Sequence, residues 1–267
     1  GPDKGSPVSI GERELRPGYR ISEIIRGGWQ LAGGHGSVDR EKAISAIPEF
    51  VEAGITTFDC ADIYTGVEAL IGESLARYKL TDKVRVHTKL VPDLDRLPSC
   101  TAKDLEAIVD RSLSRLKIER LDLVQFFWWD LAIGRPVETL ASLSVLQDKG
   151  KIRHLGINNW DVAAIAPFVA AGVEVVSAQV QYSLLDDRPT HGLSDWCETN
   201  NVGLLCYGVL AGGFLTEAWL GQSDPGYSFT NRSLVKYRLI IDEFGASSLQ
   251  HWKHAILERR PREFLMP

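Results

Sequence analysis

The chain has 267 residues, of which 44% are hydrophobic and 24% are charged, and its formal net charge is −5. This length fits either two small domains or one α/β barrel of about 250 residues. The composition is typical of a globular protein with a hydrophobic core. Acidic and basic residues are interspersed, which argues against nucleic-acid binding, because that requires a basic patch on the surface.

The cysteines are widely spaced and form no C-x-x-C pair; they are Cys60, Cys100, Cys197 and Cys206. This spacing argues against a zinc site or a disulfide framework, so we expect no metal and a reducing, cytoplasmic compartment. The chain contains no run of about 18 apolar residues, which predicts no membrane helix. No signal peptide is visible, and Gly1-Pro2 resembles a protease-cleavage scar.

Short apolar runs alternate along the chain with longer segments whose apolar residues recur at helical spacing. The runs predict strands over Ile24–Trp29, Thr56–Asp59, Val84–Lys89, Leu121–Trp128, Ile152–Ile157, Val173–Gln179 and Gly203–Leu210. The segments between them predict helices over Arg40–Ala53, Glu68–Tyr78, Ala102–Leu116, Val137–Lys149, Asp161–Ala170 and Thr190–Asn200. Asp39 precedes the first helix as a capping residue.

This alternation predicts parallel strands joined by right-handed crossovers, and its length favours a parallel (β/α)8-type TIM barrel over an open sheet. We expect a single barrel domain over residues 1–267, with a disordered start at 1–7. No G-x-G-x-x-G follows the first strand, so a Rossmann fold is disfavoured. The glycine-rich segment 33–36 is predicted to be a turn, with a phosphate cradle as the alternative.

The C-terminal end does not continue the pattern. A loop rich in Gly, Ser, Asp and Tyr follows the seventh predicted strand, and then come Ser233–Phe244 and the polar segment Ser247–Arg260. No eighth strand is evident, and residues 245–267 form an atypical tail. An open seam would leave backbone groups unpaired, so the tail closes the barrel, a second copy of the chain closes it, or the barrel is distorted.

Polar side chains follow the second and third predicted strands. Asp59 ends one strand, Tyr64 lies in the loop after it, and Lys89 ends the next strand. Since active sites of α/β barrels lie at the carboxyl ends of the strands, we expect these side chains to meet. The Lys89 ammonium could pair with Asp59 and lower the Tyr64 pKa from its usual value near ~10, so that Tyr64 exchanges a proton with a substrate oxygen. The alternative is a structural ion pair beside a loop tyrosine.

The run Asp-Cys-Ala-Asp-Ile-Tyr at 59–64, with Thr88-Lys89 after it, resembles the aldo-keto reductase family. The resemblance implies a barrel fold and catalytic roles for Asp59, Tyr64 and Lys89. The family's catalytic histidine corresponds here to Phe127, which cannot donate a hydrogen bond. One such donor to a developing oxyanion contributes roughly 3–4 kcal/mol. His87 lies on the same strand face as Lys89, and we expect it to be a core histidine.

The resemblance also implies a nicotinamide site, in which side-chain amides hold the carboxamide and an aromatic ring stacks on the nicotinamide. By this resemblance the amide contacts are Asn158, Asn159 and Gln179, and the stacking ring is Tyr207. Residues from Gly208 through Leu215, including Leu210, would line the pyrophosphate. Alternatively, the two asparagines cap the next helix and Gln179 is a strand-end amide. The family's eighth-strand cofactor motif has no match, which argues against NADP(H). Arg232, Lys236 and Arg238 could bind its 2′-phosphate, although a surface role is the simpler interpretation.

Aromatic residues near the strand ends predict an apolar pocket mouth, with barrel packing as the alternative. They are Trp29, Phe127, Trp128, Trp129 and Trp160. The substrate is therefore expected to be a small, largely apolar molecule with a carbonyl or hydroxyl group.

Three functions remain open. Phe127 and the missing cofactor motif favour non-redox acid–base chemistry by the tyrosine, lysine and aspartate, as in an isomerase, dehydratase or cyclase. The alternatives are an NADP(H)-dependent carbonyl reductase and a catalytically silent binding barrel. We expect no nucleic-acid or membrane partner, and homo-oligomerisation is left open.

Overall fold

The computed structural model describes residues 10–28, 31–32, 39–181 and 192–207. The chain divides into two compact units, of which the first takes residues 1–33, 37–179 and 192–205. The second takes residues 34–36, 180–191 and 206–267, most of which lie outside the described residues. The single-domain organisation stays a prediction. The glycine-rich turn at 33–36, the segment 233–244 and the tail 245–267 also lie outside the described residues.

Seven strands form one sheet in chain order, with a hydrogen-bonded neighbour on each side of every inner strand. They are β3 (Ile25–Gly27), β4 (Thr57–Asp59), β5 (Arg85–Leu90), β6 (Leu121–Phe126), β7 (Ile152–Asn158), β8 (Val175–Gln181) and β9 (Gly203–Tyr207). The pairs from β3 to β8 are parallel. All seven predicted strands are present, with ends shifted by up to two residues where both ends are described.

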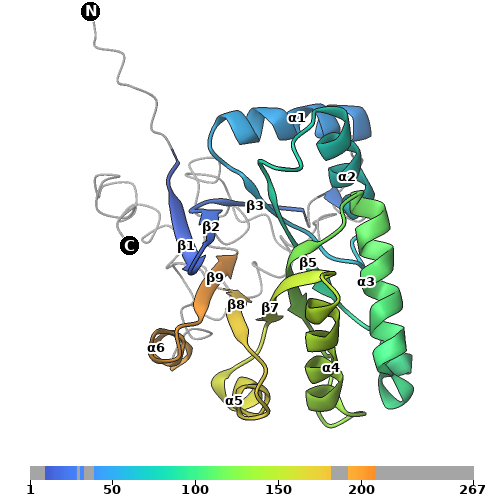
Figure 1. The fold of residues 1–267 in the computed structure, drawn as a ribbon, viewed down its shortest axis with the longest axis vertical. Helices are drawn as coiled ribbons and strands as arrows, with labels where there is room; N and C mark the ends of the chain where they lie inside the picture. The colour runs from blue at the N-terminus through green and yellow to red at the C-terminus, as the bar shows by residue number, and fades with distance from the viewer. Residues whose placement is uncertain (1–9, 29–30, 33–38, 182–191, 208–267) are drawn as a thin grey trace, which may run out of the picture. The chain divides into compact units, whose positions relative to one another are not determined.

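A helix separates each strand from the next. The helices are α1 (Arg40–Glu52), α2 (Val67–Arg77), α3 (Ala102–Leu116), α4 (Pro136–Asp148), α5 (Val162–Ala170) and α6 (Leu193–Thr199). Figure 1 shows α1 to α4 side by side along one side of the sheet. Local chemistry sets where they begin: Asp39 accepts a hydrogen bond from the Lys42 amide, and Thr101 forms a capping box with Asp104.

Three elements were not predicted from the sequence. β1 (Glu12–Arg16) and β2 (Tyr19–Ser22) form an antiparallel hairpin, and a 3₁₀ helix, η2, spans Leu94–Ser99. The hairpin strands are short and charged, so neither has the apolar run by which the other strands were recognised. The remaining signal was Pro17-Gly18, a typical turn dipeptide, and Gly18 adopts a φ of 79° in that turn.

Strand register brings the polar residues together. Asp59 lies opposite His87, Lys89 opposite Gln125, and Asn158 opposite Gln179. Residues paired in this way point to the same face of the sheet, and every second residue along a strand returns to that face. One face therefore carries a polar column that ends at the carboxyl edge of β4 to β8.

Candidate active site

Asp59 and Lys89 form a buried ion pair at the centre of this face. The Lys89 Nζ donates to Asp59 Oδ2 and to the Cys60 carbonyl oxygen, which lies 3.2 Å away. Only 4% of Lys89 and 9% of Asp59 is exposed. Burial alone would lower the Lys89 pKa, but the charge of Asp59 and the contact with Tyr64 outweigh burial, and the pKa is raised. Lys89 therefore carries its positive charge at neutral pH.

Tyr64 lies over this pair. The Lys89 Nζ is 5.1 Å from the centroid of the Tyr64 ring, and the ring is half-buried in the loop between β4 and α2. Burial raises the Tyr64 pKa above its ordinary value, while the charge of Lys89 and its hydrogen bond lower it less strongly. The predicted lowering is therefore wrong for the net pKa, since burial outweighs the ammonium. The hydroxyl keeps its proton at neutral pH.

Gln125 belongs to the same cluster and was not recognised from the sequence. Its Nε2 donates to Asp59 Oδ1 at 2.8 Å, and the Gln179 Nε2 donates to the same oxygen at 3.1 Å. The available signal was spacing, because Gln125 stands two residues before Phe127 and therefore on the same strand face. The Asp59 carboxylate thus receives donors from β5, β6 and β8.

A second buried network holds the loop that carries Tyr64. The Val91 amide donates to Asp62 Oδ1 at 3.0 Å, and Arg115 donates to the Asp62 carbonyl oxygen at 2.9 Å. Arg115 also donates to Glu68 Oε1 at 3.1 Å, and the Thr88 hydroxyl donates to Glu68 Oε2 at 2.9 Å. These bonds attach the loop to the end of β5 and to α3, so they fix its path above Lys89.

Asp62 makes this network sensitive to pH. Burial raises the pKa of its carboxyl from 3.8 to about 7, against the opposing effects of the Val91 amide and of Arg111 and Arg115. Between pH 4 and 7 the unfolded chain loses this proton while the folded protein keeps it, so stability falls as the pH rises. We expect Asp62→Asn to remove about 1–4 kcal/mol of that fall. Urea unfolding at several pH values measures the difference.

The control for this prediction is Asp148→Asn, since Asp148 is an exposed carboxylate at the end of α4. The control should follow the wild-type pH dependence. Parallel curves for the wild type and Asp62→Asn would contradict the raised Asp62 pKa.

Phe127 and Trp129 lie at the carboxyl end of β6. The Phe127 amide donates to the carbonyl oxygen of Leu90 at 3.1 Å, and Leu90 is the residue that follows Lys89 on β5. The two rings meet edge to face with centroids 5.1 Å apart. Trp129 is 49% exposed, and its Nε1 donates to the Pro92 carbonyl oxygen at 2.8 Å, which fixes the indole. These two rings form an apolar wall beside the strand end.

Trp128 and Trp160 are buried among other rings in the part of the chain that the structure describes. They are 2% and 7% exposed, and both pack on Phe126, with centroid distances of 5.6 Å. Trp160 also stacks on Phe168 of α5 at 4.7 Å. For these two residues the packing interpretation is correct, because Phe126 points to the helix-covered face of β6, opposite to Gln125. Trp29 lies outside the described residues.

The predicted cofactor residues are only partly described. Asn158 ends β7, is 8% exposed, and its Oδ1 has no hydrogen-bond partner among the residues that the structure describes. Asn159 is exposed, adopts a φ of 63°, and its amide donates to the Gln179 carbonyl oxygen at 2.8 Å. Asp161 is the N-cap of α5, so neither asparagine is. Tyr207 ends β9, and Gly208 and Leu210 lie outside the described residues.

His87 is a core histidine, as expected. It is fully buried, and its Nε2 lies 2.8 Å from the Tyr19 hydroxyl of β2. Burial lowers the His87 pKa to about 4, so the ring is neutral at physiological pH. Its hydrogen bond with Tyr19 joins the hairpin to β5, one layer below Lys89.

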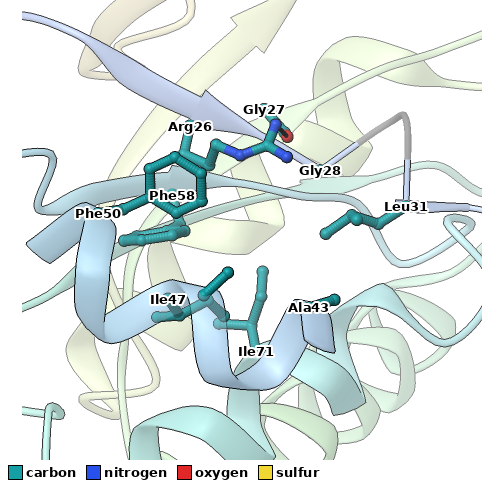
Figure 2. A pocket seen from close by; sticks show the side chains of 10 residues that line it. Arg26, Gly27, Gly28, Leu31, Ala43, Ile47, Phe50, Phe58 and Ile71 are labelled. Atoms are coloured by element: carbon teal, nitrogen blue, oxygen red, sulfur yellow. Dashed lines mark hydrogen bonds between the residues drawn. The ribbon is translucent and has the colours of Figure 1, made fainter. Parts of the chain in front are cut away.

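A pocket lies on the other face of the sheet, between α1 and the strands β3 and β4. Figure 2 shows Phe58, Ile71 and the α1 side chains Ala43, Ile47 and Phe50 around it. The Arg26 guanidinium lies 5.1 Å from the Phe50 ring and donates to the Gly27 carbonyl oxygen at 2.7 Å. Because Arg26 is paired with Phe58 in the sheet, this pocket faces away from Asp59 and is not part of the candidate site.

The described part of the chain contains neither a metal-binding cluster nor a membrane-spanning helix. No group of three or more His, Cys, Asp or Glu side chains could hold a metal ion there. No helix in that part is long and apolar enough to cross a membrane.

Comparison with known proteins identifies related sequences. The chain is 28% identical over 224 residues to the aldo-keto reductase YhdN of Bacillus subtilis, covering 81% of this chain and 66% of that protein. It is 28% identical over 232 residues to an NADH-specific methylglyoxal reductase of Escherichia coli, covering 79% and 71%. The chain thus spans about two thirds of the length of these relatives.

Comparison of structures supports the fold. The holo form of aldo-keto reductase AKR11C1 from Bacillus halodurans superposes with a TM-score of 0.68 at 23% identity, covering 82% of this chain and 72% of that one. An aldo-keto reductase from Klebsiella pneumoniae in complex with NADPH superposes with a TM-score of 0.63 at 23% identity, covering 77% and 70%. The predicted TIM-barrel fold is confirmed. The sequence model of the Aldo/keto reductase family matches residues 23–257, and the chain therefore belongs to that family.

Proposed function

We propose that the protein reduces a carbonyl compound to an alcohol with a nicotinamide cofactor. The observation that carries this proposal is the buried Lys89–Asp59 pair beneath the Tyr64 ring. Among the relatives are an NADH-specific methylglyoxal reductase and a reductase named for NADP(+). These relatives favour reduction over the non-redox chemistry predicted from the sequence.

The residues at the end of β7 fit a nicotinamide carboxamide. The Asn158 Oδ1 is a buried acceptor without a partner among the described residues, and such an atom is costly unless a donor reaches it. The carboxamide NH₂ group of a nicotinamide is a donor of this kind. The Gln179 side chain lies opposite Asn158 in the sheet and donates to Asp59 Oδ1 at 3.1 Å, so it stands between the proposed carboxamide site and the ion pair. When bound, the cofactor would supply the hydride.

The side chains of the chain itself would handle the proton. Tyr64 would donate its hydroxyl proton to the substrate oxygen, and Lys89 would stabilise the phenolate that remains. Asp59 would hold the ammonium in place. Phe127 supplies no second donor to the substrate oxygen, so we expect turnover to be slow.

The first test is a titration of the protein with NADPH and with NADH, in which tryptophan fluorescence reports binding. Consumption of the bound cofactor is then measured with methylglyoxal and with an aromatic aldehyde, since an aryl-alcohol dehydrogenase is also among the relatives. Micromolar binding and aldehyde-dependent oxidation of the cofactor support the proposal. The absence of binding at millimolar cofactor would overturn it and restore the non-redox hypothesis.

Replacing Tyr64 tests the proton donor. We expect Tyr64→Phe to lower kcat about 10²- to 10⁴-fold, because the ring remains and only the transferable proton is lost. The Kd for NADPH should stay within about twofold, since the hydroxyl is proposed to act on the substrate. Tyr78→Phe is the matched control, because Tyr78 is 39% exposed at the end of α2. Equal activity of the wild type and Tyr64→Phe would remove Tyr64 from the mechanism.

A further inference from the structure

Gln125 is an uncharged, fully buried residue of the polar column. It is 0% exposed and lies opposite Lys89 in the register of β5 and β6. Its Nε2 donates to Asp59 Oδ1 at 2.8 Å, while Lys89 takes Oδ2 of the same carboxylate. The Gln179 Nε2 of β8 donates to Oδ1 as well, at 3.1 Å, so β6 and β8 hold one carboxylate oxygen and β5 holds the other.

The other end of the Gln125 amide is unsatisfied. Its Oε1 is buried and has no partner among the described residues. An unpaired amide oxygen in a protein core is costly, and a methionine or leucine would fill the same space without that cost. The side chain thus contributes less to packing than an apolar residue would, and its described hydrogen bond goes to Asp59. A negative charge favours this orientation, because it attracts the NH₂ group and repels the oxygen.

We propose that Gln125 is a positioning residue: it holds the Asp59 carboxylate so that Oδ2 faces the Lys89 ammonium, and through Lys89 it sets how readily Tyr64 releases its proton. The kinetic part of this proposal rests on the proposed function. The part that concerns Lys89 does not, since it describes the protein without cofactor or substrate.

Other titratable groups face Lys89 and must stay unchanged in the test. The charges of Asp59, Tyr64 and Cys60 each raise the Lys89 pKa. His87 lies two residues before Lys89 on the same strand face. The test variant is Gln125→Met, which keeps the length of the side chain and removes the donor. Ser177→Ala is the matched control, because Ser177 is also 0% exposed and its Oγ also has no partner among the described residues.

The first readout is the pH titration of Lys89, which is monitored by NMR on protein with labelled lysine side chains. The Lys89 signal is identified by its absence in Lys89→Arg. In Gln125→Met we expect Lys89 to lose its proton about one pH unit lower than in the wild type, because the Gln179 amide is then the only described donor left on Asp59 Oδ1 and the less firmly held carboxylate stabilises the ammonium less. In Ser177→Ala the titration should be unchanged. Coincident titrations of the wild type and Gln125→Met would overturn the proposal, even if the variant were less stable.

The second readout is the pH profile of carbonyl reduction. For Gln125→Met we expect kcat about tenfold lower and an alkaline limb about one pH unit lower, with the NADPH Kd unchanged. If the wild type reduces no carbonyl compound, the proposed function fails, and the NMR titration still decides the role of Gln125. If Gln125→Met does not fold, Gln125→Leu takes its place in both measurements. A loss of activity with an unchanged pH profile would identify Gln125 as merely structural.

Discussion

Phe127→His is expected to raise kcat for carbonyl reduction about 100- to 1000-fold. Phe127 follows β6 on the face that carries Gln125, and its amide is bound to the carbonyl of Leu90, one residue after Lys89. An imidazole at this position would offer an N–H to the substrate oxygen, on which charge develops as the hydride arrives. Tyr64 would then be one of two donors. The measurement is steady-state kinetics with methylglyoxal and with an aromatic aldehyde.

The control must separate the gain of a donor from the loss of a phenyl ring. Phe127→Leu removes the edge-to-face contact with Trp129 without adding a donor. We expect this variant to reduce aldehydes no faster than the wild type. If Phe127→His and Phe127→Leu have equal kcat values while both bind NADPH, the missing histidine is not what limits the reaction.

The elements that place the site could be predicted because each has a local signal. Apolar runs mark the strands, and Asp39 marks where the first helix begins. Once parallel strands are recognised, Asp59 and Lys89 must lie at the same edge of the sheet, since both end their strands. Their contact in the structure confirms that geometry, whereas their catalytic roles stay predictions.

Other features depended on distances that a sequence does not contain. The net shift of the Tyr64 pKa is a balance between burial and the Lys89 charge, and only the charge is visible in the sequence. Trp128 and Trp129 are neighbours of the same type, yet one is buried and the other is half exposed. The strand predicted to end at Trp128 ends at Phe126. Trp128 and Trp129 therefore both follow the strand, where side-chain alternation no longer indicates which ring faces solvent.

Lys89→Met is expected to destabilise the protein by about 3–5 kcal/mol, because it leaves the Asp59 carboxylate buried without its counter-charge. Gln125 and Gln179 would still donate to that carboxylate, but neither carries a charge to balance it. Adding Asp59→Asn to the same chain removes the uncompensated charge. We therefore expect the double variant to recover most of the lost stability, as measured by urea unfolding of the two single variants and the double variant.

The comparison of stability with activity separates two roles of the pair. The double variant should fold nearly as well as the wild type and still reduce no aldehyde, because a neutral pair cannot stabilise the phenolate of Tyr64. A double variant no more stable than Lys89→Met would show that the charges of Asp59 and Lys89 are not coupled in the folded protein. A stable double variant that still reduced aldehydes would leave the ion pair a purely structural role. Proton donation to the substrate would then not depend on stabilisation of the Tyr64 phenolate by Lys89.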